Sequence, residues 1–90
     1  DAWGVPLSAD SDAMLITQLQ SRLVEWHWLD ADTFSVGALD AATVQAVLDF
    51  QNLMNADGMA LPLIDPTNPV VDTSTLALLM NASGQSYVRP

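Results

Sequence analysis

The sequence predicts an all-α fold, a compact three-helix bundle with an inserted proline-rich loop before the third helix. Three observations support this prediction. Apolar residues recur at helical spacing in three segments, and an aspartate stands at the start of each. Half of the 90 residues are apolar, which suffices for one modest core without disulfides or a metal.

The first predicted helix spans residues 12–26. One stripe of this segment is apolar and the opposite stripe is polar, so we expect an amphipathic helix with one buried face. Ser11 or Asp12 can accept hydrogen bonds from the open amide groups at the start, and Asp12 is the assigned cap. The apolar stripe consists of Leu15, Ile16, Leu19, Leu23 and Trp26.

The second predicted helix spans residues 41–55, with Asp40 as its N-cap and Asp57-Gly58 as the turn that stops it. Its polar stripe is narrow. A helix with so wide an apolar face needs partners on two sides, so we expect it to be the central helix of the bundle. The polar stripe consists of Gln45, Asp49 and Asn52.

The third predicted helix spans residues 73–82, is capped by Asp72 and is apolar on nearly all sides. Asn81 or Gly84 can end it. Its opening, Val71-Asp72-Thr73-Ser74-Thr75-Leu76, repeats the pattern of Leu39-Asp40-Ala41-Ala42-Thr43-Val44. In both, the aspartate accepts amide hydrogen bonds from the first turn while the threonine bonds back toward the cap. This repetition fits a pseudo-twofold relation between the two helix starts, and the alternative is a short capping pattern that recurs by chance.

These helices define a domain over residues 12–82. Residues 1–11 are predicted to be an extended lead-in, and residues 83–90, with Gly84 and Pro90, an exit linker. The chain begins at Asp1, without an initiator methionine or a charged-then-apolar leader. We therefore interpret it as a processed or excised piece of a longer protein with neighbouring domains.

The charge balance restricts the partners. Arg22 and Arg89 are the only cations against 11 carboxylates, which gives a net charge of -9. Such a field repels phosphate backbones, so we expect no nucleic acid and instead a neutral, zwitterionic or cationic partner. The alternative is an acidic surface that serves solubility alone. No apolar run has the roughly 20 residues that membrane insertion requires.

The sequence predicts no catalytic residues, no metal site and no cofactor. Cysteine is absent and His27 is the only histidine, whereas a catalytic zinc takes three protein ligands and a general base needs a second positioned group. The pairs Asp10-x-Asp12 and Asp30-x-Asp32 lack the further oxygen ligands and the glycine of a calcium loop.

Four motifs follow one another along the chain: Gln18-Leu19-Gln20-x-Arg22-Leu23; Gly37-x-Leu39-Asp40-x-x-Thr43-x-x-Ala46-Val47-x-x-Phe50-Gln51; Asp57-Gly58; and Asp72-x-x-Thr75-Leu76-x-x-Leu79. In this order they resemble the peptidoglycan-binding-like domain, a three-helix cell-wall-binding module, over residues 12–82. The middle motif is the most specific. The resemblance implies a non-catalytic module that holds a larger secreted bacterial protein on the peptide stem or glycan of peptidoglycan, outside the cell or in its wall.

The candidate ligand-binding residues are Trp28, Gly37, Leu39 and Asp40, which we expect around a shallow groove between the end of the first helix and the start of the second. Trp28 follows that helix end, where an aromatic body with a polar N–H suits a half-exposed site. Burial in the core is the alternative for its side chain. Negative charge near the groove favours an ammonium-bearing residue of the stem.

The chain departs from the family pattern at two places. His27 stands where the family usually has glycine, and histidine tolerates the left-handed backbone that ends a helix. Residues 59–71 replace a short turn with a loop of three prolines. We expect residues 61–64 to fold back onto the bundle and residues 65–68 to form an exposed turn.

These departures favour an alternative function, a protein–protein interaction or spacer domain that keeps the scaffold without binding sugar. An enzyme with paired carboxylates is a third hypothesis, since aspartate is plentiful. Against it, Asp40 and Asp72 are already assigned as caps, and a small bundle offers little concave space.

Overall fold

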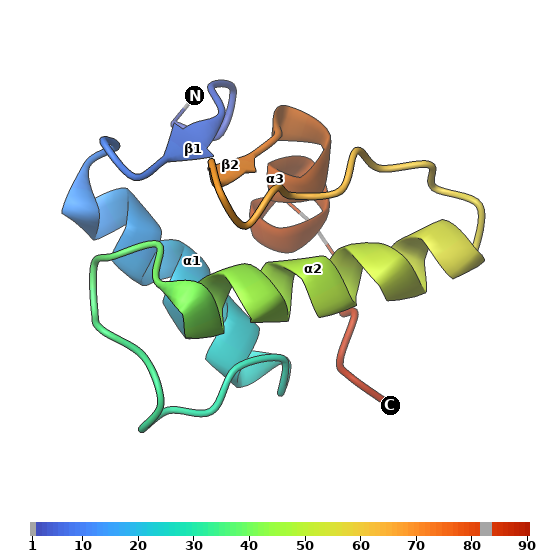
Figure 1. Ribbon diagram of the computed structural model, residues 1–90. Coiled ribbons are helices and arrows are strands. Elements are labelled where there is room, and N and C mark those ends of the chain that lie inside the picture. Colours follow the sequence, from blue (N-terminus) through green and yellow to red (C-terminus); the bar gives the residue numbers. More distant parts are fainter. Residues whose placement is uncertain (1, 82–83) are drawn as a thin grey trace.

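A computed structural model describes residues 2–81 and 84–90. The predicted third-helix end at residue 82 and the predicted linker start at residue 83 lie outside the described residues. Along the chain the described elements are β1 (Leu7–Ser8), α1 (Ala13–Glu25), α2 (Ala41–Ala56), β2 (Val70–Val71) and α3 (Thr73–Met80) (Figure 1).

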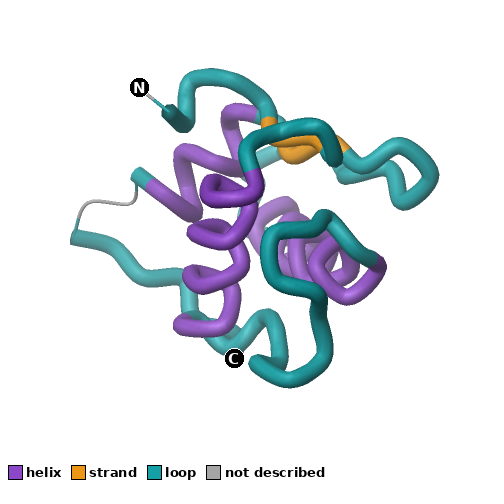
Figure 2. Tube along the Cα trace, turned by 90° about the vertical axis from the view of Figure 1, so that its left-hand side faces the viewer, coloured by secondary structure: helices purple, strands orange, loops and turns teal. Residues whose placement is uncertain are grey.

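The prediction of an all-α fold was wrong, because the structure adds a two-stranded antiparallel sheet to the three helices. Leu7 of β1 faces Val71 of β2, and Ser8 faces Val70. The Leu7 and Val71 side chains are buried in the core. Strands of two residues are too short to show the period-two pattern by which a strand is recognised in a sequence. The sheet and the C-terminal residue lie at opposite ends of the molecule (Figure 1 and Figure 2).

Both segments that flank the predicted domain pack against it. Leu7, in the predicted lead-in, belongs to the hydrophobic core, and Trp3 packs against that core. In the predicted exit linker, Tyr87 packs on the same core, and the Arg89 amide donates to the Trp26 carbonyl at 2.8 Å. The packed unit therefore extends on both sides of residues 12–82.

Helix α1 has close backbone contacts with both α3 and α2. Helix α2 also meets α3, since the Gln51 amide nitrogen donates to the Thr75 hydroxyl at 3.0 Å. The wide apolar face of α2 predicted partners on two sides, and the inserted loop, which runs beside α2 in Figure 1, covers part of that face. Leu61 and Ile64 of this loop are buried in the core, whereas Leu63 between them is exposed.

Each helix begins at an aspartate whose carboxylate accepts a backbone N–H of the first turn. Asp12 accepts from Met14 at 2.9 Å, Asp40 from Thr43 at 3.0 Å, and Asp72 from Ser74 at 3.0 Å. These bonds satisfy amide groups that have no partner within the helix.

Two helix ends share one hydrogen-bond pattern. At the end of α1, the His27 amide donates to the Val24 carbonyl and the Trp28 amide to the Leu23 carbonyl. His27 has φ 65°, in the left-handed region. The end of α2 repeats both bonds around Gly58, which has φ 91°. Both are Schellman turns, and His27 fills the position that glycine usually takes.

A buried glutamine holds each inter-helix loop to the cap that follows it. The Gln20 amide nitrogen donates to the Thr43 hydroxyl at 2.9 Å, and that hydroxyl donates to Asp40 at 2.7 Å. In the second half of the chain, the Gln51 amide nitrogen donates to the Thr75 hydroxyl at 3.0 Å, which donates to the carboxylate of Asp72.

The inserted loop is fastened to α2 by side-chain amides. Asn55 exchanges two hydrogen bonds with the backbone of Leu61, at 2.9 Å and 2.6 Å. The Gln51 side chain accepts from the Ile64 amide at 2.8 Å. Beyond Ile64, the Asn68 amide donates to the Asp65 carbonyl at 3.1 Å, which closes an exposed turn over residues 65–68. This loop places Pro66 and Pro69 near the start of α2.

Candidate functional site

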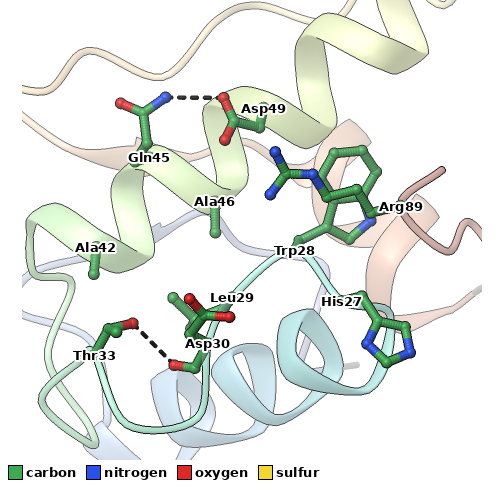
Figure 3. A pocket seen from close by; sticks show the side chains of 10 residues that line it. All are labelled: His27, Trp28, Leu29, Asp30, Thr33, Ala42, Gln45, Ala46, Asp49 and Arg89. Carbon is green, nitrogen blue, oxygen red and sulfur yellow. Dashed lines mark hydrogen bonds between the residues drawn. The ribbon is translucent and has the colours of Figure 1, made fainter.

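A pocket of about 220 Å³ lies between the end of α1 and the face of α2. We call it the Trp28 pocket. One wall is the loop that follows α1, the second is α2, and the third is the C-terminal segment (Figure 3). Its lining residues are His27, Trp28, Leu29, Asp30, Thr33, Ala42, Gln45, Ala46, Asp49 and Arg89.

Trp28 belongs both to the core and to this pocket. The Schellman turn at His27 directs the chain back across the bundle, and the Trp28 side chain is buried. Its ring meets the Phe50 ring edge-on, with centroids 5.6 Å apart. The indole N–H donates to the Tyr87 carbonyl at 2.7 Å, as a buried tryptophan requires. The indole is therefore fixed in place, and its N–H already has an acceptor in the Tyr87 carbonyl.

Arg89 supplies the positive charge of the pocket. Its guanidinium lies over the Trp28 ring, 5.9 Å from the centroid, a distance at which a cation and an aromatic face attract each other. Among residues 2–81 and 84–90, Arg89 forms no ion pair, whereas Arg22 pairs with Glu25 at 3.2 Å and donates to the Leu79 carbonyl. Arg22 thus holds α3 to α1, and Arg89 faces the pocket.

Two carboxylates stand on opposite walls. Asp49 projects from α2 and accepts a hydrogen bond from Gln45 at 2.8 Å. Asp30 is exposed on the loop that follows α1, where its carbonyl accepts from the Thr33 hydroxyl at 3.0 Å. Figure 3 shows Asp49 above and Asp30 below, with Arg89 beside Trp28. The pocket therefore presents both signs of charge around an aromatic wall.

A second pocket of about 250 Å³ lies at the start of α2, against the inserted loop. We call it the proline pocket. It is lined mainly by apolar side chains, and Gln45 lines both pockets. Its lining residues are Leu39, Asp40, Ala41, Val44, Gln45, Pro66 and Pro69.

The four predicted ligand-binding residues do not share one groove. Trp28 lines the Trp28 pocket, and Leu39 and Asp40 line the proline pocket. Gly37 lines neither. It has φ 82°, its amide donates to the Gln20 side chain at 2.9 Å, and an added Cβ would lie 3.2 Å from that of Ala13. Gly37 is therefore required by the backbone where the loop meets α1.

The carboxylate of Asp40 is occupied by its own loop and helix. One oxygen accepts from the Ser35 amide at 2.6 Å and the other from the Thr43 amide and hydroxyl. Burial raises the pKa of Asp40, but these hydrogen bonds outweigh it, and the pKa lies below its ordinary value of 3.8. Asp40 is thus an ionised structural anchor at the rim of the proline pocket.

Of the ten residues that line the Trp28 pocket, the sequence had indicated only Trp28 as a candidate ligand contact. Gln45 and Asp49 had been assigned to the polar stripe of the second helix, and Arg89 lies in the segment predicted to be a linker. A signal for Arg89 did exist. A buried tryptophan needs an acceptor for its N–H, and the C-terminal segment provides it through Tyr87.

The described part of the chain holds no group of three or more His, Asp or Glu side chains placed to bind a metal ion. In the pair Asp10-x-Asp12, the Asp12 carboxylate accepts a hydrogen bond from the Met14 amide as the N-cap of α1. Within the same described ranges, no helix has the length and apolar character needed to span a membrane. Comparisons of the chain with protein-family models, with curated proteins and with solved structures give no match.

Proposed function

We propose that this chain is a non-catalytic module that attaches a larger secreted protein to peptidoglycan in the cell wall. The observation that carries the proposal is the Trp28 pocket, an aromatic wall with charges of both signs between the end of α1 and α2. The sequence predicted a groove between the end of the first helix and the start of the second, and the Trp28 pocket lies at the end of α1. Peptide stems and sugars offer the neutral and charged groups that such a pocket accepts.

The net charge of -9 supports the same assignment. A strongly acidic surface disfavours anionic polymers and favours ligands that carry ammonium groups. A peptide stem with an ammonium-bearing residue fits this field. We therefore expect binding to the stem to weaken when its amino groups are acetylated.

A sedimentation assay on purified sacculi tests the proposal. Trp28 is a poor choice for substitution, because it is buried and its removal disturbs the core. Asp49→Ala changes the pocket wall from the surface of α2, and Gln18→Ala on the exposed face of α1 is a matched control. We expect the wild type and the Gln18 variant to sediment with the sacculi and the Asp49 variant to remain largely in solution.

Helical circular dichroism must be equal for all three proteins. A wild-type chain that stays in the supernatant at every sacculus concentration would falsify the proposal.

The alternative function, a protein-interaction or spacer domain, is favoured by the proline pocket. Its apolar lining includes Leu39, Val44, Pro66 and Pro69, two of them from the inserted loop. A protein partner that binds the wild-type chain, does not bind the Pro66→Asp variant at the exposed edge of this pocket and is indifferent to muropeptides would replace wall attachment as the function.

A further inference from the structure

Arg89 is held in place in a way that leaves its charged group available. The backbone amide is fixed to the Trp26 carbonyl at 2.8 Å, and the preceding Tyr87 carbonyl is fixed by the Trp28 indole N–H. The guanidinium rests over the indole and has no ion pair within the described ranges. Its planar array of N–H donors matches the two oxygens of a carboxylate.

Negative charge is present in the same pocket as the Arg89 guanidinium. Asp49 projects from α2 and Asp30 lies on the loop beneath it (Figure 3). These two carboxylates favour an ammonium group in the same pocket. Because the whole chain carries -9, a ligand with carboxylates alone is repelled at long range. A ligand that combines a carboxylate with an ammonium group avoids that repulsion.

The size of the pocket limits the ligand. About 220 Å³ is less than the roughly 300–1,000 Å³ of pockets that enclose drug-sized molecules. A single amino acid or the end of a short peptide fills such a space. Trp28 is buried beneath Arg89, so the indole serves to hold the guanidinium in place at the pocket wall.

We infer that the Trp28 pocket binds an amino-acid-sized zwitterion, with its carboxylate on Arg89 and its ammonium group facing Asp49 and Asp30. This inference deepens the proposed function and rests on it for the source of the zwitterion, a peptide-stem residue whose side chain carries a free carboxylate and a free ammonium group. It assigns the C-terminal segment, outside the region of the family resemblance, as the element that determines specificity for a carboxylate.

The test is a titration of the isotope-labelled 90-residue chain with D-alanyl-D-alanine, followed by nuclear magnetic resonance. We expect saturable shifts of the Trp28 indole N–H and of the Asp49 amide. The N-acetylated dipeptide lacks the ammonium group and the dipeptide amide lacks the carboxylate. Each should bind at least about tenfold more weakly, because a charge-assisted hydrogen bond is lost.

Arg89→Gln removes the charge and keeps the length of the side chain, and Val88→Ala is the matched control at the neighbouring exposed residue. We expect the Arg89 variant to bind the dipeptide and its amide with equal weakness, while the Val88 variant behaves as the wild type. Unchanged dipeptide affinity in the Arg89 variant overturns the inference, as does equal wild-type affinity for all three probes.

The two proposals fail separately. A chain that sediments with sacculi but gives no shifts with the dipeptide keeps its wall-binding function and loses the zwitterion site. A chain that binds the dipeptide through Arg89 but ignores sacculi keeps the site and loses the wall as the source of its ligand.

Discussion

Replacing Gln20 with alanine should destabilise the fold more than any exposed polar substitution, because its buried side chain is hydrogen-bonded to four groups. The amide nitrogen donates to the Ser35 and Ala38 carbonyls and the Thr43 hydroxyl, and the amide oxygen accepts from Gly37. The amide nitrogen shares its two hydrogens among its three acceptors, so the side chain makes the equivalent of about three hydrogen bonds, which at about 0.5–1.5 kcal/mol each contribute roughly 1.5–4.5 kcal/mol.

Truncation at Gln20 also removes a buried methylene worth about 0.8 kcal/mol, while water entering the space restores part of the hydrogen bonding. We expect the free energy of unfolding to fall by about 3 kcal/mol. In a domain of this size that lowers the melting temperature by roughly 10–20 °C. Urea unfolding followed by circular dichroism measures the change directly.

Gln18→Ala is the control, since Gln18 lies two positions away on the exposed face of α1. It should alter the stability by no more than about 0.5 kcal/mol. A loss below about 1 kcal/mol for Gln20→Ala would refute the reasoning, because it would mean that the loop carbonyls find equivalent partners without the glutamine. The Gln20 variant should also lose ligand binding, since the loop that it releases carries part of the Trp28 pocket wall.

Three further predictions concern the backbone, the core and the titration of a cap. His27→Gly should raise the free energy of unfolding, measured by urea unfolding, by about 1 kcal/mol, since glycine adopts the φ of 65° without steric cost. An unchanged or lower free energy would show that the His27 backbone is not strained. Leu7→Ala should lower the free energy of unfolding by about 2–5 kcal/mol, because the Leu7 side chain is only 1% exposed. Val5→Ala is the control, at a position 65% exposed, and should change the free energy of unfolding by less than about 0.5 kcal/mol. Equal effects of the two substitutions would show that β1 does not pack against the core. Burial raises the pKa of Asp40, but its hydrogen bonds outweigh burial and hold the folded-state pKa below the ordinary 3.8. The ionised form therefore stabilises the fold above pH 3.8, and this contribution is lost as the pH falls through the folded-state pKa. Thermal melts from about pH 6 to about pH 3 should show the difference in melting temperature between wild type and Asp40→Asn closing, and a constant difference argues against this role.

The helices could be predicted from the sequence because the residues that start them and the apolar patterns that define them are local. A capping aspartate acts on amide groups two or three positions away, as Asp12, Asp40 and Asp72 do here. The apolar stripes repeat within one or two turns, so a short window of sequence contains the whole signal.

The sheet and the Trp28 pocket depend on contacts between distant parts of the chain. Leu7 meets Val71 across almost the whole sequence, and two-residue strands carry no periodic pattern. The placement of Arg89 depends on the Trp28 indole finding its acceptor at Tyr87. Composition had marked this segment as a linker, because it contains Gly84 and Pro90.

Comparison of the two Schellman turns raises the question of why position 27 is histidine and not glycine. Both turns make the same hydrogen bonds and hold the same residue in the left-handed region, yet one has glycine and the other histidine. A non-glycine residue there costs about 1–2 kcal/mol, and its exposed side chain does nothing for the core. His27 also lines the Trp28 pocket, and retained backbone strain is common at binding sites. A binding role for His27 predicts that His27→Gly separates two properties, with higher stability and weaker retention on sacculi in the same protein. If the glycine variant gains stability and keeps full retention, the strain at His27 has no part in binding.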